Sequence, residues 1–96
     1  MANYRLSNVA KEDLIRIHQY GLKTFGEKIA DEYFESFFYY FELIGKQPYA
    51  FETVDFIKPG YRRCVCGVDS IYYRINEDTV EIMSIVGRQD LHNKLN

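Results

Sequence analysis

The hydrophobic pattern changes its period once along this chain, near residue 60. Between residues 29 and 44 the large apolar side chains recur every three or four positions, whereas from residue 61 onward they alternate with polar ones. A repeat near 3.6 places side chains on one face of a helix, and a repeat of two places them on one face of a strand. The sequence therefore predicts helices followed by strands, which is the α+β class.

The predicted second helix has an unusually wide apolar face. On a helical wheel this face covers an arc of about 140°, so we expect it to pack on both the first helix and a sheet. Gly45 followed by Pro48 predicts the end of this helix, because glycine tolerates a left-handed cap and proline cannot continue the hydrogen-bond ladder. The face consists of Ile29, Ala30, Tyr33, Phe34, Phe37, Tyr40, Phe41 and Ile44, with Phe38 at its margin.

A first helix is predicted to begin after Ser7, whose hydroxyl group suits an N-cap position. Thr24 and Glu27 have the spacing of a capping box, which predicts that the first helix ends and the second begins near Phe25 and Gly26. The residues before Ser7 alternate over positions 3–6, a pattern typical of a short strand.

Three further strands are predicted at residues 61–66, 70–75 and 79–86, separated by three-residue connections. Such short connections indicate an antiparallel meander. The element order is then βααβββ. We expect a single domain over residues 1–96, with two layers: a helix pair packed on one face of a small antiparallel sheet.

Charge and hydropathy exclude several classes of function. The net charge is −2, and residues 27–55 carry seven acidic and two basic side chains, which argues against a general phosphate binder. No apolar run approaches about 18 residues, and the first residues lack the basic-then-apolar order of a signal peptide. We expect no membrane contact and a cytoplasmic location.

Cys64 and Cys66 are separated by one residue, so their side chains share one face of a strand. This spacing suits neither a disulfide framework nor a closed zinc site. We interpret them as reduced thiols; the alternative is a redox or metal role that recruits His18 or His92. Because the usual nucleophile, phosphate-loop and zinc motifs are missing, we expect no catalytic residue, no cofactor and no metal.

Three other features remain open to two interpretations. His18 lies within the apolar face of the first helix, which favours a buried, hydrogen-bonded histidine over a catalytic base. Arg62 and Arg63 should point to opposite faces of a strand, where they either pair with acidic side chains or anchor a carboxylate or phosphate of a partner. Tyr39 stands on the polar side of the second helix, where it either covers its neighbours or marks a docking surface.

Four segments together resemble the ParE branch of the ParE/RelE toxin superfamily, and the resemblance covers nearly the whole chain in order. They are Tyr4-Arg5-Leu6-Ser7 with Ala10 and Asp13-Leu14, Phe25-Gly26 with Ala30 and Tyr33, Pro59-Gly60-Tyr61-Arg62-Arg63, and Ile71-Tyr72-Tyr73-Arg74 with the ending from Val86 to Asp90. The joint order and spacing of these motifs are specific, although each motif is weak alone.

The resemblance implies a βααβββ fold and a toxin of a type II toxin–antitoxin pair, of the kind linked to plasmid stabilisation. ParE-type relatives bind and block DNA gyrase, and a ParD-like antitoxin neutralises them in a hetero-oligomer by wrapping the toxin with its C-terminal segment. RelE-type relatives instead cut messenger RNA in the ribosome. Direct sequence-specific binding of nucleic acid is not expected.

Residue matching favours the ParE branch. Arg62 coincides with an arginine that RelE-like nucleases use, but ParE-like proteins share it. After Gly87 the nuclease pattern requires more basic residues and a later tyrosine or histidine, whereas this chain has Arg88, Gln89 and Asp90, and Leu95 stands near the expected tyrosine. An RNA cleavage needs groups that activate the hydroxyl and protonate the leaving oxygen. Gly87 also departs from ParE relatives, many of which have a histidine there.

These comparisons define two sets of candidate residues. The predicted contacts with gyrase are Arg62, Arg63, Arg88, Asp90 and His92. The predicted contacts with the antitoxin are Tyr4, which lies on an edge strand that a partner could extend, and Ile15, Leu22, Tyr33 and Tyr39. The alternative for Ile15, Leu22 and Tyr33 is ordinary packing between the helices. Two alternative functions stay open: a ribosome-dependent endoribonuclease, and an inactive toxin that acts as an antitoxin-binding corepressor.

Overall fold

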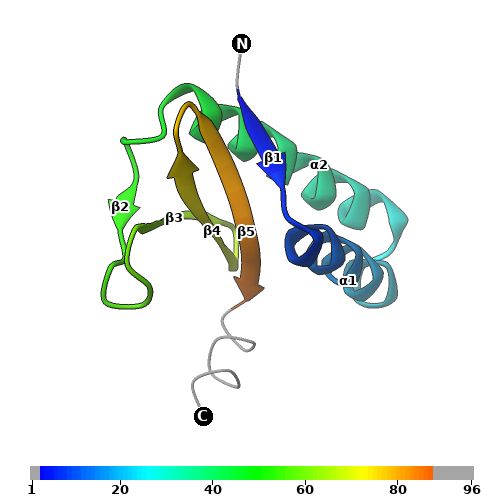
Figure 1. The fold of residues 1–96 in the computed structure, drawn as a ribbon. Coiled ribbons are helices and arrows are strands. Elements are labelled where there is room, and N and C mark those ends of the chain that lie inside the picture. The colour runs from blue at the N-terminus through cyan, green and yellow to red at the C-terminus, as the bar shows by residue number, and fades with distance from the viewer. Residues whose placement is uncertain (1–2, 88–96) are drawn as a thin grey trace.

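The computed structural model describes residues 3–87 of the 96-residue chain. Two helices, α1 and α2, lie on one side of a five-stranded sheet in the strand order β1-β5-β4-β3-β2 (Figure 1). The predicted α+β class and the helix pair on a sheet are confirmed. The elements are β1 (Tyr4–Leu6), α1 (Asn8–Phe25), α2 (Glu27–Lys46), β2 (Glu52–Thr53), β3 (Tyr61–Cys66), β4 (Asp69–Asn76) and β5 (Thr79–Gly87).

The sheet is mixed rather than wholly antiparallel. The β3–β4–β5 meander is antiparallel, as predicted, but β1 pairs with β5 in parallel, with Tyr4 opposite Val80. A parallel pair needs a long crossover, and here everything from α1 to β4 provides it. The short strand β2, which the sequence pattern did not predict, pairs with β3 at the other edge of the sheet.

The core lies between the helix pair and the inner face of the sheet. Phe37, Phe41 and Ile44 of α2 are fully buried there. From the sheet they meet Ile71, Tyr73, Val80, Ile82, Ile85, Cys64 and Cys66. Burying each large side chain contributes roughly 1.5–3 kcal/mol, so this layer supplies most of the stability. Both cysteines are free and buried. None of the described helices is long and apolar enough to cross a membrane.

The helix boundaries match the prediction in place, but two of the predicted caps are wrong. Gly26, at φ +88°, separates the helices without any side-chain cap, so Thr24 and Glu27 form no capping box. The second helix continues through Gly45 to Lys46, and Gln47 donates its backbone N–H to the Leu43 carbonyl. A left-handed glycine therefore supplies the break between the helices rather than the end of the second one.

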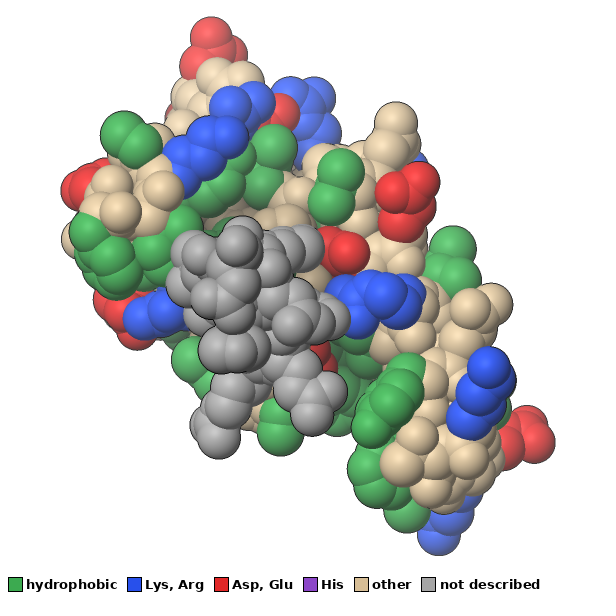
Figure 2. Space-filling model, turned by 90° about the horizontal axis from the view of Figure 1, so that it is seen from below, with side chains coloured by type: hydrophobic (Ala, Val, Ile, Leu, Met, Phe, Trp, Pro, Cys, Tyr) green, Lys and Arg blue, Asp and Glu red, His purple; other side chains and the backbone are tan. Residues whose placement is uncertain are grey.

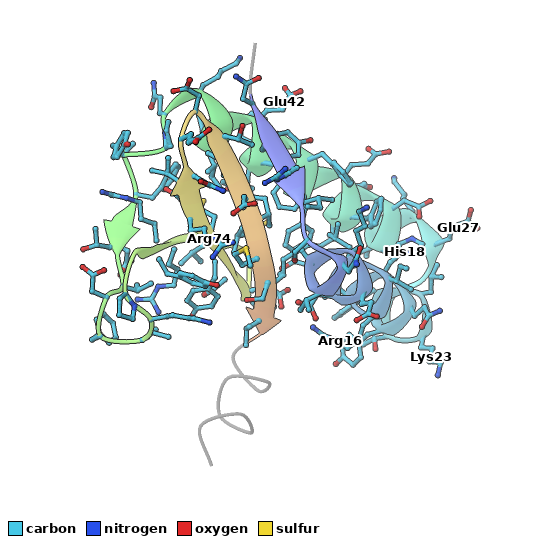
Figure 3. All side chains as sticks on the ribbon, viewed as in Figure 1. Arg16, His18, Lys23, Glu27, Glu42 and Arg74 are labelled. Carbon is cyan, nitrogen blue, oxygen red and sulfur yellow. The ribbon has the colours of Figure 1, made fainter. Side chains whose placement is uncertain are left out.

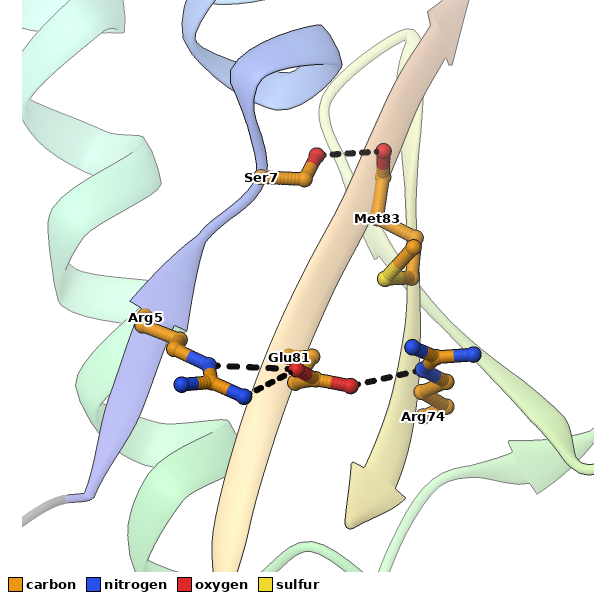
Figure 4. A network of polar contacts seen from close by, with 5 residues as sticks. All are labelled: Arg5, Ser7, Arg74, Glu81 and Met83. Atoms are coloured by element: carbon orange, nitrogen blue, oxygen red, sulfur yellow. Dashed lines mark hydrogen bonds and ion pairs between the residues drawn. The ribbon is translucent and has the colours of Figure 1, made fainter.

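Ser7 is the N-cap of α1, as predicted. Its Oγ accepts the Ala10 N–H at 3.0 Å and donates to the Met83 carbonyl of β5 at 2.8 Å (Figure 4). Ile85 of the same strand donates its N–H to Asp13 Oδ2 of α1 at 2.9 Å. These contacts fix the start of α1 against β5.

We expect the Ser7→Ala substitution to lower the free energy of unfolding by about 1–2 kcal/mol, because it removes both hydroxyl contacts. Ser7→Thr keeps the hydroxyl group and is the matched control. Urea unfolding followed by circular dichroism measures the difference, and equal midpoints for the alanine variant and the wild type would contradict the assignment.

Burial, with a smaller contribution from Cys66, raises the pKa of the Cys64 thiol from 9.0 to about 11. The unfolded chain therefore loses this proton first as the pH rises. We expect the stability contributed by this thiol to be complete below pH 9 and to be lost between pH 9 and about pH 11, at up to about 1.4 kcal/mol per pH unit. Cys64→Val removes this component, so its unfolding free energy should fall less steeply over that range. Parallel slopes for the two proteins would contradict the prediction.

Candidate partner-binding surfaces

The outer side of the helix pair carries exposed apolar side chains, although the helices bury their other sides. Ile15 and Leu22 of α1 are 57% and 40% exposed. His18 lies three residues after Ile15 and four before Leu22, so the three share one helix face. The His18 ring contacts Phe34 of α2 edge-on, with centroids 5.2 Å apart, and Phe34 in turn contacts Phe38. We call Ile15, His18, Leu22, Phe34 and Phe38 the hairpin surface.

His18 joins the two helices at the middle of the hairpin surface. Its Nε2 lies 2.7 Å from Asp31 Oδ1, and the side chain is partly buried (Figure 3). The predicted hydrogen bond of His18 is therefore confirmed, but the ring is only partly buried rather than buried as predicted. Glu27 and Glu42 lie toward opposite ends of α2, with Glu42 near β1 (Figure 3). The apolar stripe thus has acidic side chains at both ends, an arrangement that suits an amphipathic partner with basic flanks.

The antitoxin candidates separate into two groups in the structure. Ile15 and Leu22 are exposed together rather than packed between the helices. Tyr4 lies on β1 against α2, with its ring 5.5 Å from Phe41, and burial followed by Glu42 raises its pKa. Tyr39 is 66% exposed, but it follows Phe38 by one residue and so points about 100° away around α2.

Tyr33 is engaged in an internal contact. Its hydroxyl oxygen lies 2.6 Å from Asp69 Oδ2 and 2.9 Å from the Cys66 carbonyl oxygen. Burial and the Asp69 carboxylate raise the pKa of this hydroxyl above its usual value. A Cβ atom on Gly67 would lie only 2.7 Å from the Tyr33 ring. Tyr33 therefore fixes α2 to the β3–β4 turn, and its side chain packs on the sheet rather than between the helices.

The opposite face of the sheet, which no described helix covers, is here called the open face. Arg63 lies on it and donates to Glu52 Oε1 at 2.8 Å. This hydrogen bond, and then the proximity of the Tyr72 hydroxyl, raises the pKa of Arg63. Arg5 and Arg74 flank Glu81 across three strands and both donate to its carboxylate (Figure 4). Hydrogen bonds from Arg5 and then from Arg74 lower the pKa of Glu81.

Arg62 points to the other side of the strand, as the alternation predicted. Its Nη1 donates to the Phe51 carbonyl at 2.7 Å, and its guanidinium lies 5.1 Å from the centroid of the Tyr49 ring. These contacts hold the segment after α2 in place, so the structure gives Arg62 a role in loop structure. Arg62 and Arg63 therefore do not converge on one site.

A shallow concavity of about 200 Å³ lies at the end of the open face. Its lining combines the Arg63 side chain with apolar and small residues, namely Val65, Gly67, Val68, Ser70, Val86 and Gly87. The other three gyrase candidates, Arg88, Asp90 and His92, lie outside the described residues. Among the predicted gyrase contacts that the structure describes, Arg63 lines this concavity and Arg62 does not.

Phe56 and Ile57, in the loop between β2 and β3, were not among the predicted contact residues, yet they are 78% and 42% exposed. Their signal was present in the sequence as an aromatic–aliphatic pair between Asp55 and Lys58, inside a stretch rich in turn-forming residues. Within residues 3–87 no group of three or more histidine, cysteine or acidic side chains is arranged to hold a metal ion.

Comparison with known proteins agrees with this architecture. The family described as the ParE toxin of the type II toxin–antitoxin system parDE matches residues 4–91. Toxin ParE1 of Caulobacter vibrioides is 32% identical over 96 residues, which cover all of this chain and 94% of that protein.

This chain also resembles proteins of known structure. One described as the chromosomal ParDE toxin–antitoxin system of P. aeruginosa superposes with a TM-score of 0.78 at 16% identity, covering 88% of this chain and 94% of that one. This likeness shows the fold. A conserved hypothetical protein of Helicobacter pylori superposes with a TM-score of only 0.48 at 12% identity, covering 95% and 99% of the two chains, and no argument rests on it. The family match and the curated relative together show that this chain belongs to the ParE toxin family of type II toxin–antitoxin systems.

Proposed function

We propose that this toxin acts in the cytoplasm by binding DNA gyrase and blocking it, and that a ParD-like antitoxin neutralises it. Family membership implies an antitoxin partner. The gyrase target is our extension from the resemblance of the sequence to gyrase-blocking ParE toxins. Arg63 and the residues after Gly87, including Arg88, Asp90 and His92, are the proposed gyrase contacts.

The observation that supports binding rather than RNA cleavage is the pairing of the open-face arginines. Arg5 and Arg74 share the Glu81 carboxylate, and Arg63 pairs with Glu52. An RNA phosphate would have to compete with these acids, and a nuclease also needs groups that accept and donate protons at the ribose and the leaving oxygen. Among the described residues, this face combines ion-paired arginines with apolar side chains. Such a surface suits a protein partner better than a nucleic-acid backbone.

The hairpin surface is the proposed docking site of the antitoxin. Ile15 and Leu22 offer apolar anchors about two helical turns apart, and Phe34 and Phe38 lie between the two helices. Glu27 and Glu42 add negative charge at the ends. An amphipathic antitoxin segment with basic flanks would bury the apolar stripe and meet these acids. Tyr4 extends this surface toward β1. Tyr39 lies outside it, so the antitoxin would reach Tyr39 only through a second, separate contact on α2.

We expect the full chain to inhibit supercoiling of a relaxed plasmid by purified DNA gyrase, with inhibition that rises with toxin concentration. Premixing with the antitoxin encoded beside the toxin gene should restore full supercoiling, because the antitoxin sequesters the toxin. Antitoxin alone is the control. Unchanged supercoiling over a large molar excess of toxin would exclude gyrase as the target.

Leu22→Asp places a charge on the apolar stripe, so we expect it to weaken antitoxin binding by about 10-fold to 100-fold in titration calorimetry. Tyr20→Asp is the matched control, because Tyr20 is 63% exposed and lies about 160° around α1 from Leu22. Equal affinities for the two variants would place the antitoxin elsewhere.

A further inference from the structure

We propose that the loop over residues 54–60, with Phe56 at its tip, is the principal contact of this toxin with its target protein. Together with the neighbouring concavity it forms a knob beside a hollow, here called the loop surface: Phe56, Ile57, Val65, Val68 and Val86. This inference rests on the proposed function, since it takes gyrase as the target, and it assigns the contact to residues that the resemblance did not indicate.

The loop is held in one conformation by a set of short contacts. Ile57 and Lys58 both donate their N–H groups to the Val54 carbonyl, at 2.8 and 3.0 Å. Asp55 Oδ1 accepts the N–H of Gly60 at 2.7 Å, and Gly60 adopts a φ of +83° that favours glycine. The Lys58 ammonium lies over the Tyr61 ring, 5.2 Å from its centroid. A loop ordered in this way loses little conformational entropy when it binds.

The loop nevertheless exposes its largest apolar side chains. Phe56 is 78% exposed, more than the other large exposed apolar residues within residues 3–87. Val54, two residues earlier, is completely buried. The loop therefore packs one apolar side chain against the sheet and leaves the larger one, Phe56, in solvent. A rigid aromatic side chain that projects into solvent buries nothing in the free toxin, and side chains of this kind often serve as anchors in partner pockets.

The loop and the concavity are linked through Val86 on the open face. Val54 packs with Tyr72 and Val86 in a small cluster on the open face, and Val86 also lines the concavity. Val65 and Val68, which line the same concavity, are 56% and 72% exposed. Figure 2 shows hydrophobic side chains gathered at the left end of the molecule, where this loop lies, and a second group at the lower right over the helices.

The shape and charge of the loop surface favour a folded target rather than the antitoxin. A convex aromatic side chain fits a preformed pocket, whereas an amphipathic antitoxin segment fits an extended apolar stripe such as the hairpin surface. The nearby acids are already engaged, since Glu52 pairs with Arg63 and Asp55 caps Gly60. Lys58, whose ammonium lies over the Tyr61 ring, supplies the positive charge of the loop, which suits a target pocket with an apolar base and an acidic rim.

The test compares three full-length variants in the gyrase supercoiling assay. Phe56→Ala should raise the toxin concentration for half-inhibition about tenfold or more, and Ile57→Asp, which adds a charge to the same tip, should do the same. Phe25→Ala makes the same change at a residue that is 59% exposed at the end of α1, and it should inhibit like the wild type. Unfolding midpoints in urea should be unchanged in all three variants, and antitoxin affinity should be unchanged in the two loop variants.

The outcomes separate this inference from the proposed function. Inhibition by the wild type and Phe25→Ala, with loss in both loop variants, supports the inference. Equal inhibition by all four proteins overturns it and leaves gyrase as the target. A wild type that neither inhibits nor binds gyrase removes the proposed function and this inference with it.

Discussion

The burial of only one face of the sheet determines the rest of this structure. The aromatic stripe of α2 covers the inner face, where Phe37, Phe41 and Ile44 are fully buried against the central strands. No second helical layer covers the open face within the described residues. On that face the Arg5–Glu81–Arg74 row pairs charged side chains, and Val54, Tyr72 and Val86 form a small apolar cluster.

Tyr72 and Tyr73 are successive residues of β4, so their side chains point to opposite faces of the sheet. Tyr73 points inward, is completely buried and donates its hydroxyl to the Pro48 carbonyl at 2.6 Å. Tyr72 points to the open face, where the Arg63 guanidinium approaches its hydroxyl. The two layers thus present different chemistry, with an acid-ended apolar stripe on the helices and a knob beside a hollow on the sheet. Two partners can engage such a molecule through separate surfaces.

Local periodicity was enough to predict the helices, the meander and the opposite directions of Arg62 and Arg63, because these depend on near neighbours in the chain. The parallel pairing of β1 with β5 joins residues about 75 positions apart, and the strand order alone does not determine it. The two residues of β2 are too few to carry a pattern. The break near Gly26 was predicted in the right place, but from the capping-box spacing of Thr24 and Glu27. In the structure the break comes instead from Gly26 itself, which adopts a positive φ.

Side-chain exposure was the hardest feature to predict for the candidate surfaces. Ile15 and Leu22 lie near the edge of an apolar helical face, so only the packed structure separates them from buried neighbours such as Leu14. Arg62 matched a family motif, yet the loop carbonyls of Tyr49 and Phe51 take up its guanidinium. Phe56 and Ile57 were passed over because a loop has no periodicity from which to judge the direction of a side chain.

The claim that the toxin acts by binding rather than by cutting RNA is tested most directly by incubating it with translating ribosomes and an end-labelled messenger RNA. We predict that the transcript stays at full length, even when ribosomes and toxin are equimolar. Multiple-turnover cleavage that disappears when Arg62 or Arg63 is replaced by alanine would contradict the account.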